Sequence, residues 1–396
     1  MKQFFSLLLV STVFFMSCQK EDVEPTSSKN SDPGVSISKK NVAIESGESM
    51  DLDLTYSGFN RDISFSFESS NTAVATVSHD GNILAKAPGT ADIFLKSADN
   101  TPIDTCKVSV FRWTLMEFSE EADFTAIYAI QNDKQNNIWF GGGGGLYKYD
   151  GHSLINYYTA DNGFNSPWVT SILFDENDDI WVGTGSGIYF SDGSDWIIFN
   201  KYNSGLSDDD ITCLAIDSEK NIWAGTDEGL CKFDGKIWHS YASSTGSLNK
   251  IRDIYIDEQD MLWAASEGGV ATFDGVDWKK VSPPLGAYDG FRCIHKDNDN
   301  NIWAGTSLSG VHKYDGTEWK KTGQAHVLDN TDIHQIKADN NGTIWIAASN
   351  GLYRFNGTKW IRYSPHETNL ALSLFIDSAN NKWCGGYSEF FKLENE

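Results

Sequence analysis

The hexapeptide NIWAGT stands at residues 221–226 and recurs letter for letter at residues 301–306. Related segments surround it, and each holds a tryptophan that lies 38 to 42 residues from the next one. An aspartate stands six residues before each of these tryptophans. A self-similar period near 40 residues is typical of propellers and solenoids, so the sequence predicts a repeat protein. The seven pairs are Asp133/Trp139, Asp175/Trp181, Asp217/Trp223, Asp257/Trp263, Asp297/Trp303, Asp339/Trp345 and Asp377/Trp383.

Each copy contains the residues of four short strands. An apolar stretch such as ITCLAI at 211–216 precedes the aspartate, and the tryptophan strand and a strand such as GLYKY at 145–149 follow it. An Asp-Gly or Asn-Gly pair then leads to the fourth strand, and such pairs favour the tight turn of a hairpin. Four antiparallel strands form one blade, so we predict an all-β, seven-bladed β-propeller over residues 112–396. The seventh copy ends after its third strand, and we expect residues 112–118 to supply the fourth strand and close the ring.

The residues before the propeller divide into three predicted parts. The run from Phe4 to Met16 is apolar but too short to span a bilayer, which predicts a signal peptide over residues 1–17. Residues 18–33 are polar and have the composition of a flexible tether. Residues 34–111 hold short alternating runs separated by turn residues, which predict a small Ig-like β-sandwich.

Two resemblances to known families follow from these motifs. The repeat pattern D-x3-[ND]-IW-x-GT-x2-GL-x-K-[FY]-DG-x2-W resembles the two-component regulator propeller family across residues 112–396. Such propellers are best known in periplasmic sensors of hybrid histidine kinases that detect oligosaccharides, so the resemblance implies ligand binding. The sequence shows neither a kinase segment nor a later membrane-spanning helix, so we expect only the binding role to carry over. The segment SNTAVATVSHDGNILAKAPGTADIFL at 70–95 resembles the bacterial Ig-like group 2 module, which implies a spacer domain.

The N-terminal segment also resembles the signal of bacterial lipoproteins. Ser17 precedes Cys18, as in the box where the cysteine becomes the acylated N-terminus. Residues 19–22, Gln-Lys-Glu-Asp, resemble the export tag of Bacteroidetes-type lipoproteins that are displayed on the outer face of the cell. The resemblance implies lipidation of Cys18, a lipid anchor as the sole membrane contact, and a location at the outer membrane with exposure on the cell surface.

The charge and the scarcity of catalytic motifs exclude several function classes. The formal net charge is −24, whereas binding to nucleic acid requires a basic face. The eight histidines are scattered, and neither a GxSxG nor an HExxH motif is present. The five cysteines after Cys18 show no CxxC spacing. We therefore predict no nucleic-acid partner, no metal, no cofactor and no catalytic residue, although an enzyme site assembled from several blades would leave no motif.

Functional residues are expected at positions that depart from the repeat pattern. The seven aspartates fit a turn role, since an aspartate side chain readily accepts hydrogen bonds from its own turn, and the repeated tryptophans fit the blade cores. Trp168 is the one tryptophan outside the repeating positions, and it precedes the first strand of its blade near the expected opening of the ring. It either presents a face on which a sugar ring stacks or packs over Phe164 and closes its own loop.

The first strands of the blades carry a second set of variable residues. Their second and third positions bring polar groups to one half of the ring entrance, and these groups either bind a ligand or pair with each other and with acids of the loops such as Asp208, Asp209 and Asp210. Together with Trp168, the predicted ligand-binding residues are Tyr128, Arg252, Asp253, Arg292, His334, Gln335 and Tyr288.

These observations predict a surface-exposed lipoprotein whose propeller binds an extracellular ligand, a carbohydrate before other classes, without transforming it. Two alternatives stay open at this point. One is a protein–protein platform that docks an outer-membrane transporter or another partner protein, and the other is a polysaccharide lyase or hydrolase. A fold by itself does not choose among these functions.

Overall fold

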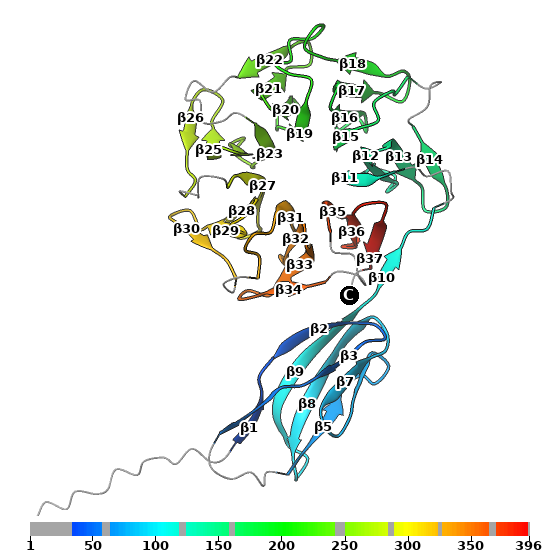
Figure 1. The fold of residues 1–396 in the computed structure, drawn as a ribbon, viewed down its shortest axis with the longest axis vertical. Helices are drawn as coiled ribbons and strands as arrows, with labels where there is room; N and C mark the ends of the chain where they lie inside the picture. The colour runs from blue at the N-terminus through cyan, green and yellow to red at the C-terminus, as the bar shows by residue number, and fades with distance from the viewer. Residues whose placement is uncertain are drawn as a thin grey trace, which may run out of the picture.

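The computed structural model describes residues 34–57, 64–118, 124–157, 163–241, 250–283, 289–323, 327–363 and 370–394. Within these ranges the chain forms strands, turns and loops but no helix, so the predicted all-β class is confirmed. In the same ranges, no helix offers the length and apolar character that a membrane span requires. Figure 1 shows two units joined end to end: a ring of sheets and a smaller sandwich.

The sandwich is built from three sheets. Alternating apolar residues explain its core, because buried side chains such as Ile83, Ile93 and Val108 recur at every second position of their strands and meet between the sheets. The first sheet has the order β2 (Asn41–Glu45), β9 (Pro102–Phe111), β8 (Gly89–Ser97) and β5 (Phe65–Ser69); the second has β3 (Ser49–Asp51), β7 (Asn82–Ala85) and β6 (Ala75–Val77); the third has β1 (Gly34–Ile37) and β4 (Leu54–Ser57).

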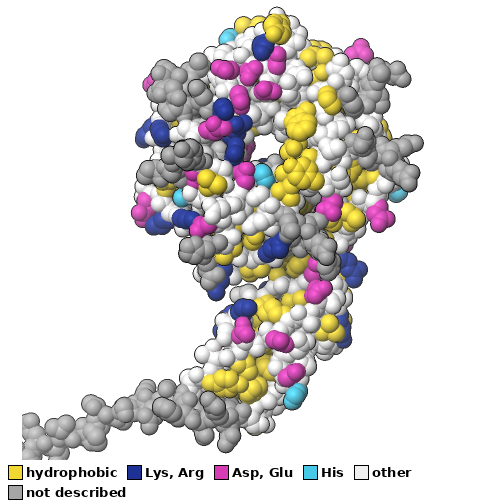
Figure 2. Space-filling view, in the orientation of Figure 1, with side chains coloured by type: hydrophobic (Ala, Val, Ile, Leu, Met, Phe, Trp, Pro, Cys, Tyr) yellow, Lys and Arg dark blue, Asp and Glu magenta, His cyan; other side chains and the backbone are white. Residues whose placement is uncertain are grey.

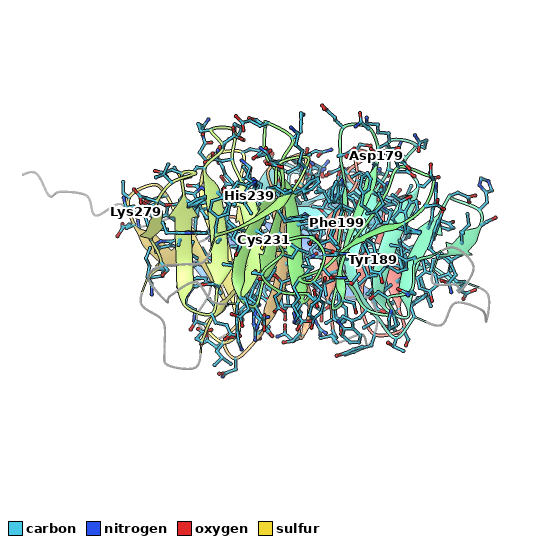
Figure 3. All side chains as sticks on the ribbon, turned by 90° about the horizontal axis from the view of Figure 1, so that it is seen from above. Asp179, Tyr189, Phe199, Cys231, His239 and Lys279 are labelled. Carbon is cyan, nitrogen blue, oxygen red and sulfur yellow. The ribbon has the colours of Figure 1, made fainter. Side chains whose placement is uncertain are left out.

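In the described residues after Phe111, seven four-stranded antiparallel sheets stand around a central opening, which is consistent with the predicted seven blades. Figure 3 shows the ring edge on, as a flat disc with the labelled Tyr189, Phe199 and Cys231 between its faces. From inner to outer strand, the first two sheets are β11 (Ala126–Asn132), β12 (Ile138–Gly143), β13 (Gly145–Tyr149) and β14 (Leu154–Asn156), then β15 (Val169–Phe174), β16 (Ile180–Thr184), β17 (Gly187–Ser191) and β18 (Ile197–Phe199). The third and fourth sheets are β19 (Ile211–Ile216), β20 (Ile222–Thr226), β21 (Gly229–Phe233) and β22 (Trp238–Tyr241), then β23 (Ile251–Ile256), β24 (Leu262–Ser266), β25 (Gly269–Phe273) and β26 (Trp278–Lys280). The fifth and sixth sheets are β27 (Phe291–Lys296), β28 (Ile302–Thr306), β29 (Val311–Tyr314) and β30 (Trp319–Lys321), then β31 (Ile333–Ala338), β32 (Ile344–Ala348), β33 (Gly351–Phe355) and β34 (Trp360–Arg362).

The last sheet joins the two ends of the propeller sequence. It contains β35 (Ser373–Ile376), β36 (Lys382–Gly385), β37 (Phe390–Leu393) and, on its outer side, β10 (Trp113–Leu115). β10 pairs antiparallel with β37, in a register that places Trp113 opposite Leu393. The Trp113 indole N–H donates to the backbone oxygen of Tyr363 in the preceding blade at 2.5 Å. Only Arg112 separates β9 of the sandwich from β10, so the closing strand also connects the two domains.

The repeated aspartates bind their own turns, and they also bind the repeated tryptophans. In the third blade, Asp217 accepts from the backbone N–H of Asn221 at 2.8 Å and from the Trp223 indole N–H at 2.9 Å. Lys232 of the neighbouring strand lies 3.3 Å from the same carboxylate and 4.9 Å from the centre of the Trp223 ring. The fixed offset of six residues therefore has a physical cause that the sequence did not reveal, because it places the carboxylate beside the indole N–H. All seven copies make this indole bond.

Replacing Asp217 by asparagine tests the importance of this contact. Burial alone would raise the pKa of Asp217, but the hydrogen bonds from Asn221 and Trp223 outweigh it and lower the pKa. The variant loses the charge, and we expect the free energy of unfolding to fall by about 2 kcal/mol in urea titrations at neutral pH. Asp257→Asn is the matched control, because Asp257 has a longer indole bond of 3.4 Å, and its loss should be about 1 kcal/mol or less. Equal losses would contradict this interpretation.

Candidate functional site

The innermost strands carry an irregularity that shapes the axis of the ring. In the second to sixth blades, the pairing of the first strand with the second shifts by one residue after the first residue of the strand, and in the first blade it shifts after the second residue, Ile127. A bulge of this kind leaves one residue unpaired and re-aims the side chains around it. Side chains of the unpaired residue and of the residue after it therefore line one axial cavity. The residues at the bulge are Tyr128, Thr170, Thr212, Arg252, Arg292 and His334.

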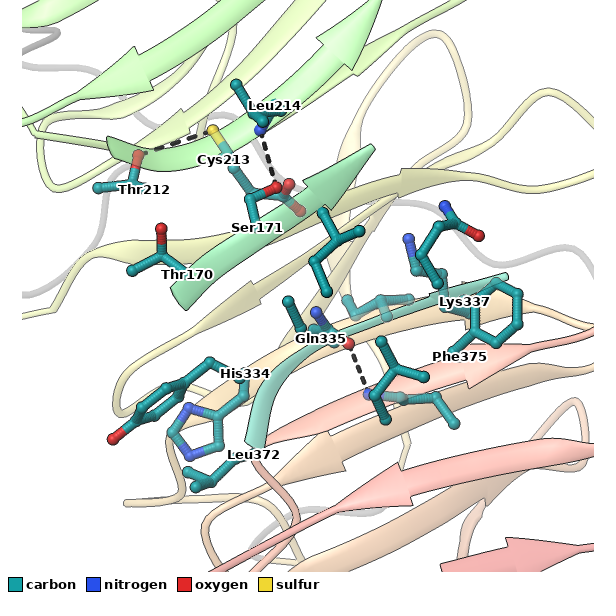
Figure 4. Close-up of a pocket in the computed structure, with 18 of the residues that line it drawn as sticks. Thr170, Ser171, Thr212, Cys213, Leu214, His334, Gln335, Lys337, Leu372 and Phe375 are labelled. Atoms are coloured by element: carbon teal, nitrogen blue, oxygen red, sulfur yellow. Dashed lines mark hydrogen bonds between the residues drawn. The ribbon is translucent and has the colours of Figure 1, made fainter. Parts of the chain in front are cut away.

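The axial cavity has a volume of about 420 Å³. This volume is within the usual range for small-molecule sites, which is roughly 300–1,000 Å³. Figure 4 shows Thr170, Thr212, His334 and Leu372 toward one end of the cavity, and Lys337 and Phe375 toward the other. The residues at the first end mark the opening that we call the mouth, on the face that also carries Trp168. The cavity thus brings together six of the predicted residues, namely Tyr128, Arg252, Asp253, Arg292, His334 and Gln335.

Two of these six side chains connect neighbouring blades. A carboxylate oxygen of Asp253 accepts from the backbone N–H of Ile294 at 2.9 Å, and the Gln335 side-chain oxygen accepts from that of Leu374 at 2.5 Å. The hydroxyl oxygen of Ser171 accepts an equivalent hydrogen bond from a backbone N–H of the next blade. The third position of the inner strands therefore contributes a bond between blades as well as a cavity wall, a role that the sequence did not predict for Asp253 and Gln335.

Asp253 is an ionisable residue enclosed by the ring. Burial raises the pKa of Asp253 to about 6, although Lys337 and the backbone N–H groups of Ile294 and Ile254 oppose the shift. In the unfolded chain an aspartate has a pKa of about 3.9, so between these values the native state holds more protons than the unfolded state. Asp253 therefore favours the native state less as the pH rises through 6.

Comparison of the wild-type protein with Asp253→Asn should reveal this titration. We expect the stability of the variant relative to wild type to increase as the pH rises from about 4 to about 6 and then to level off, because the variant has no buried carboxylate to ionise. Chemical denaturation at several pH values measures the difference. Burial lowers the pKa of His295 and of His334 in both proteins, so their titration cancels in the comparison. A difference that stays constant with pH would contradict the assignment.

Charged side chains occupy one half of the mouth and are paired. Arg252 donates to Asp227 at 3.2 Å and to Glu267 at 2.6 Å. The Nε of Arg292 lies 3.3 Å from a carboxylate oxygen of Asp332. These partners differ from the loop acids that were expected.

The acids of the loop after β18 were expected to pair with the polar groups of the mouth, but they lie beside a different cation. Asp208 and Asp209 each have an oxygen 3.7 Å from the Nζ of Lys201. The charge pattern of this half of the mouth therefore comes from the turns that follow β20 and β24 and from the connection before β31, which lie far apart in the sequence.

Several polar atoms at the mouth are buried without a hydrogen-bond partner in the described part of the chain. They are the Nε atoms of Arg252 and Arg292, one oxygen of Asp332 and the Nε2 of His334. Burial and the nearby Arg292 lower the pKa of His334 while Asp332 opposes them, so the ring is neutral at pH 7 and can donate or accept. Buried polar groups require partners, which water or the hydroxyl groups of a ligand would supply.

Aromatic side chains occupy the opposite half of the mouth. Trp168 is 48% exposed, and its ring centre lies 5.3 Å from that of Tyr128. Burial and the neighbouring Tyr387 raise the pKa of Tyr128, and Tyr387 itself is 59% exposed. Figure 2 shows hydrophobic side chains gathered along one side of the central opening and acidic and basic side chains along the other.

The neighbours of Trp168 decide between its two expected roles. Phe164 is fully buried and packs against Tyr189 and Trp196, whereas the ring partner of Trp168 is Tyr128. These contacts favour an exposed ring face of Trp168 over closure of its loop on Phe164, and both roles stay predictions. Tyr387 was not predicted, although its segment Gly-Gly-Tyr-Ser departs from the Gly-Thr turn that three other copies carry at 183–184, 225–226 and 305–306.

The glycine run at 141–145 lets the neighbouring segments approach the second strand of this blade closely. A β-carbon at Gly143 would lie 2.3 Å from the Thr125 hydroxyl and 3.5 Å from the Trp168 ring. A β-carbon at Gly142 would lie 1.8 Å from the backbone oxygen of Ala126. Gly143 and Trp168 also form an isolated β-bridge, so the turn after β12 and the segment before β15 lie together. The glycines are therefore required for close approach at this blade.

Two predicted residues lie outside the described ranges, namely Tyr288 and Cys18. The predicted lipidation therefore stays a prediction, as does the stacking role of Tyr288. In the ranges that are described, no group of three or more histidine, cysteine, aspartate or glutamate side chains is arranged to hold a metal ion. The cysteines described there, at positions 106, 213, 231, 293 and 384, are buried and free.

Comparisons with family models match both units of the chain. Residues 33–108 match the bacterial Ig-like domain (group 2), and residues 163–186 and 205–228 match the two component regulator propeller. Both sequence resemblances are thereby confirmed for these residues. No curated protein sequence matches the chain.

Solved structures share the propeller fold. The extracellular domain of a candidate hybrid two-component system, BT3049, from B. thetaiotaomicron is 22% identical with a TM-score of 0.61, and the alignment covers 72% of this chain and 42% of that one. The extracellular domain of BT4673, a candidate one-component system of the same organism, is 19% identical with a TM-score of 0.59, over 71% and 40% of the two chains. This chain thus spans less than half of either domain.

A catalytically inactive virginiamycin B lyase from Staphylococcus aureus, solved with quinupristin, is also similar. It is 13% identical with a TM-score of 0.62, and the alignment covers 72% of this chain and 100% of the lyase. Sensor domains and a lyase therefore share this architecture, and these likenesses establish the fold alone.

Proposed function

We propose that the propeller binds an extracellular carbohydrate at the mouth of its axial cavity and does not transform it. The observation that carries this proposal is that exposed aromatic rings and polar atoms without hydrogen-bond partners lie around the same opening. Trp168 and Tyr387 are about half exposed, and His334 and Arg252 hold polar atoms without hydrogen-bond partners among the described residues.

The chemistry of a sugar matches both halves of the mouth. The C–H groups on one face of a sugar ring form an apolar plane that stacks on an aromatic ring, and the hydroxyl groups at its edge donate and accept hydrogen bonds. A ligand that leaned on Trp168 would reach toward Arg292 and His334 across the opening. Concave sites of this size typically hold a few directed polar groups among apolar walls.

The proposal includes a location for the protein. Acylation of Cys18 would anchor the chain in the outer membrane, and the Ig-like domain would hold the propeller away from the lipid surface. The lipoprotein resemblance of residues 17–22 supports this location. Both B. thetaiotaomicron proteins that share the fold are described as extracellular domains, which agrees with exposure on the cell surface.

Binding measurements on the soluble chain from residue 19 to residue 396 test the proposal. Affinity gels and calorimetry against plant, host and microbial polysaccharides should identify at least one polymer that binds, with no new reducing or unsaturated ends after a day. Release of such ends would establish a lyase or hydrolase instead. Failure to bind every polymer would overturn the proposal, and pull-down experiments for an outer-membrane transporter or another protein partner would then take its place.

A further inference from the structure

We infer that the carbohydrate bound at the mouth is a neutral oligosaccharide and not one that carries carboxylate, sulfate or ammonium groups. This inference rests on the proposed function and specifies its ligand class. The structural basis is that the described cations of the cavity, Arg252, Arg292 and Lys337, each have an acidic side chain close by.

Arg252 would be the natural partner of an acidic sugar, because a guanidinium group binds a carboxylate through two parallel bonds. Its two terminal nitrogens are already engaged, one with Asp227 at 3.2 Å and the other with Glu267 at 2.6 Å. Lys250 lies 3.5 Å from Glu267 as well. An acidic ligand could reach Arg252 only by displacing two carboxylates of the protein.

Arg292 and the cation inside the cavity also have acidic side chains beside them. Asp332 lies 3.3 Å from Arg292, and Asp253 interacts electrostatically with Lys337 inside the ring. The cations Arg252, Lys250, Arg292 and Lys337 are thus matched in number by the acids Asp227, Glu267, Asp332 and Asp253. Among these described side chains the two signs are equal in number, so the pairs leave no net charge to attract a charged sugar.

The groups that remain available suit hydroxyl groups. They are single donors or acceptors, such as the Nε2 of the neutral His334, and a sugar hydroxyl can satisfy either kind. The whole chain carries a formal charge of −24, which repels polyanions such as sulfated or uronate polymers. Local pairing and long-range repulsion therefore both disfavour anionic sugars, and local pairing alone disfavours cationic ones.

Pairs of polymers that differ in charge test this inference. We would titrate the soluble protein with hydroxyethyl cellulose and carboxymethyl cellulose, with laminarin and yeast mannan as further neutral probes, and with alginate, heparin and chitosan as charged probes. We expect binding to at least one neutral probe, with an affinity that changes less than about twofold between 0.05 and 0.5 M NaCl. Binding to charged probes alone would overturn the inference and leave carbohydrate binding intact. Binding to no probe would overturn the proposed function and this inference with it.

A variant that frees Arg252 provides a second test. Asp227→Asn combined with Glu267→Gln keeps the side-chain sizes and removes both negative partners. We expect the affinity for oligogalacturonate to rise by about tenfold and to become salt-dependent, because a charge-assisted pair then becomes available. Asp234→Asn combined with Asp274→Asn, which removes two exposed charges in the turns after β21 and β25, is the matched control for net charge. An equal gain in both variants would assign the effect to net charge and contradict the role of the pairing.

Discussion

Replacement of Trp168 by alanine is expected to weaken glycan binding by about 30-fold, which corresponds to about 2 kcal/mol. The indole offers an exposed flat surface at the mouth, and its position is set by Tyr128 on one side and by Gly143 beneath it. Calorimetry with the polymer that binds the wild-type protein measures the loss. Because the side chain is 48% exposed, the free energy of unfolding should change by less than about 1 kcal/mol.

Two control variants separate stacking from other effects. Trp168→Phe retains a flat ring and should recover most of the affinity. Tyr56→Ala removes an aromatic side chain of similar exposure from the Ig-like domain, and we expect it to leave binding unchanged. Unaltered binding by Trp168→Ala would exclude this ring from the site, and a loss shared by Tyr56→Ala would point to a general effect on the protein.

The closing strand gives the second large effect. Trp113→Ala removes a side chain that is 7% exposed, packs edge to face against Phe391 at 6.3 Å, and donates to the backbone of Tyr363. Loss of a buried tryptophan costs about 3–5 kcal/mol, and here the contacts join the first strand to the last sheet. We expect a fall of that size in the free energy of unfolding, measured by denaturant titration of tryptophan fluorescence.

Leu115→Ala is the matched control for this strand. Leu115 belongs to the same strand β10 but is 47% exposed, so its removal should cost less than about 1 kcal/mol. If Trp113→Ala unfolds at the same denaturant concentration as wild type, the closure contacts would not contribute as the structure indicates.

The sequence predicted the fold through its periodic features. The fixed aspartate-to-tryptophan offset and the Asp-Gly turns specify local hairpins, and local hairpins repeated at one period define blades. The hydrogen bond from the Trp223 indole to Asp217 shows why the offset is constant, but that contact became visible only in the structure.

The site was predicted less completely, because its parts meet only across the ring. The variable positions of the inner strands predicted Arg252, Arg292 and His334, because equivalent positions in successive repeats occupy equivalent places around the ring. The pairing of Arg252 with Asp227 and Glu267 depends on turns in two different blades, and Tyr387 reaches the mouth from the last sheet. Such contacts depend on how the blades are placed around the axis, which no local pattern specifies.

Hydroxyl-radical footprinting of the protein with and without its glycan tests the central claim most directly. The ligand is proposed to cover the mouth, so oxidation of Trp168 and Tyr387 should fall severalfold in the complex. Val276 and Tyr56 are 81% and 54% exposed and lie in the turn after β25 and in the Ig-like domain, so their oxidation should stay the same. Protection of Val276 or Tyr56, with Trp168 and Tyr387 oxidised as in the free protein, would place the ligand elsewhere and contradict the account.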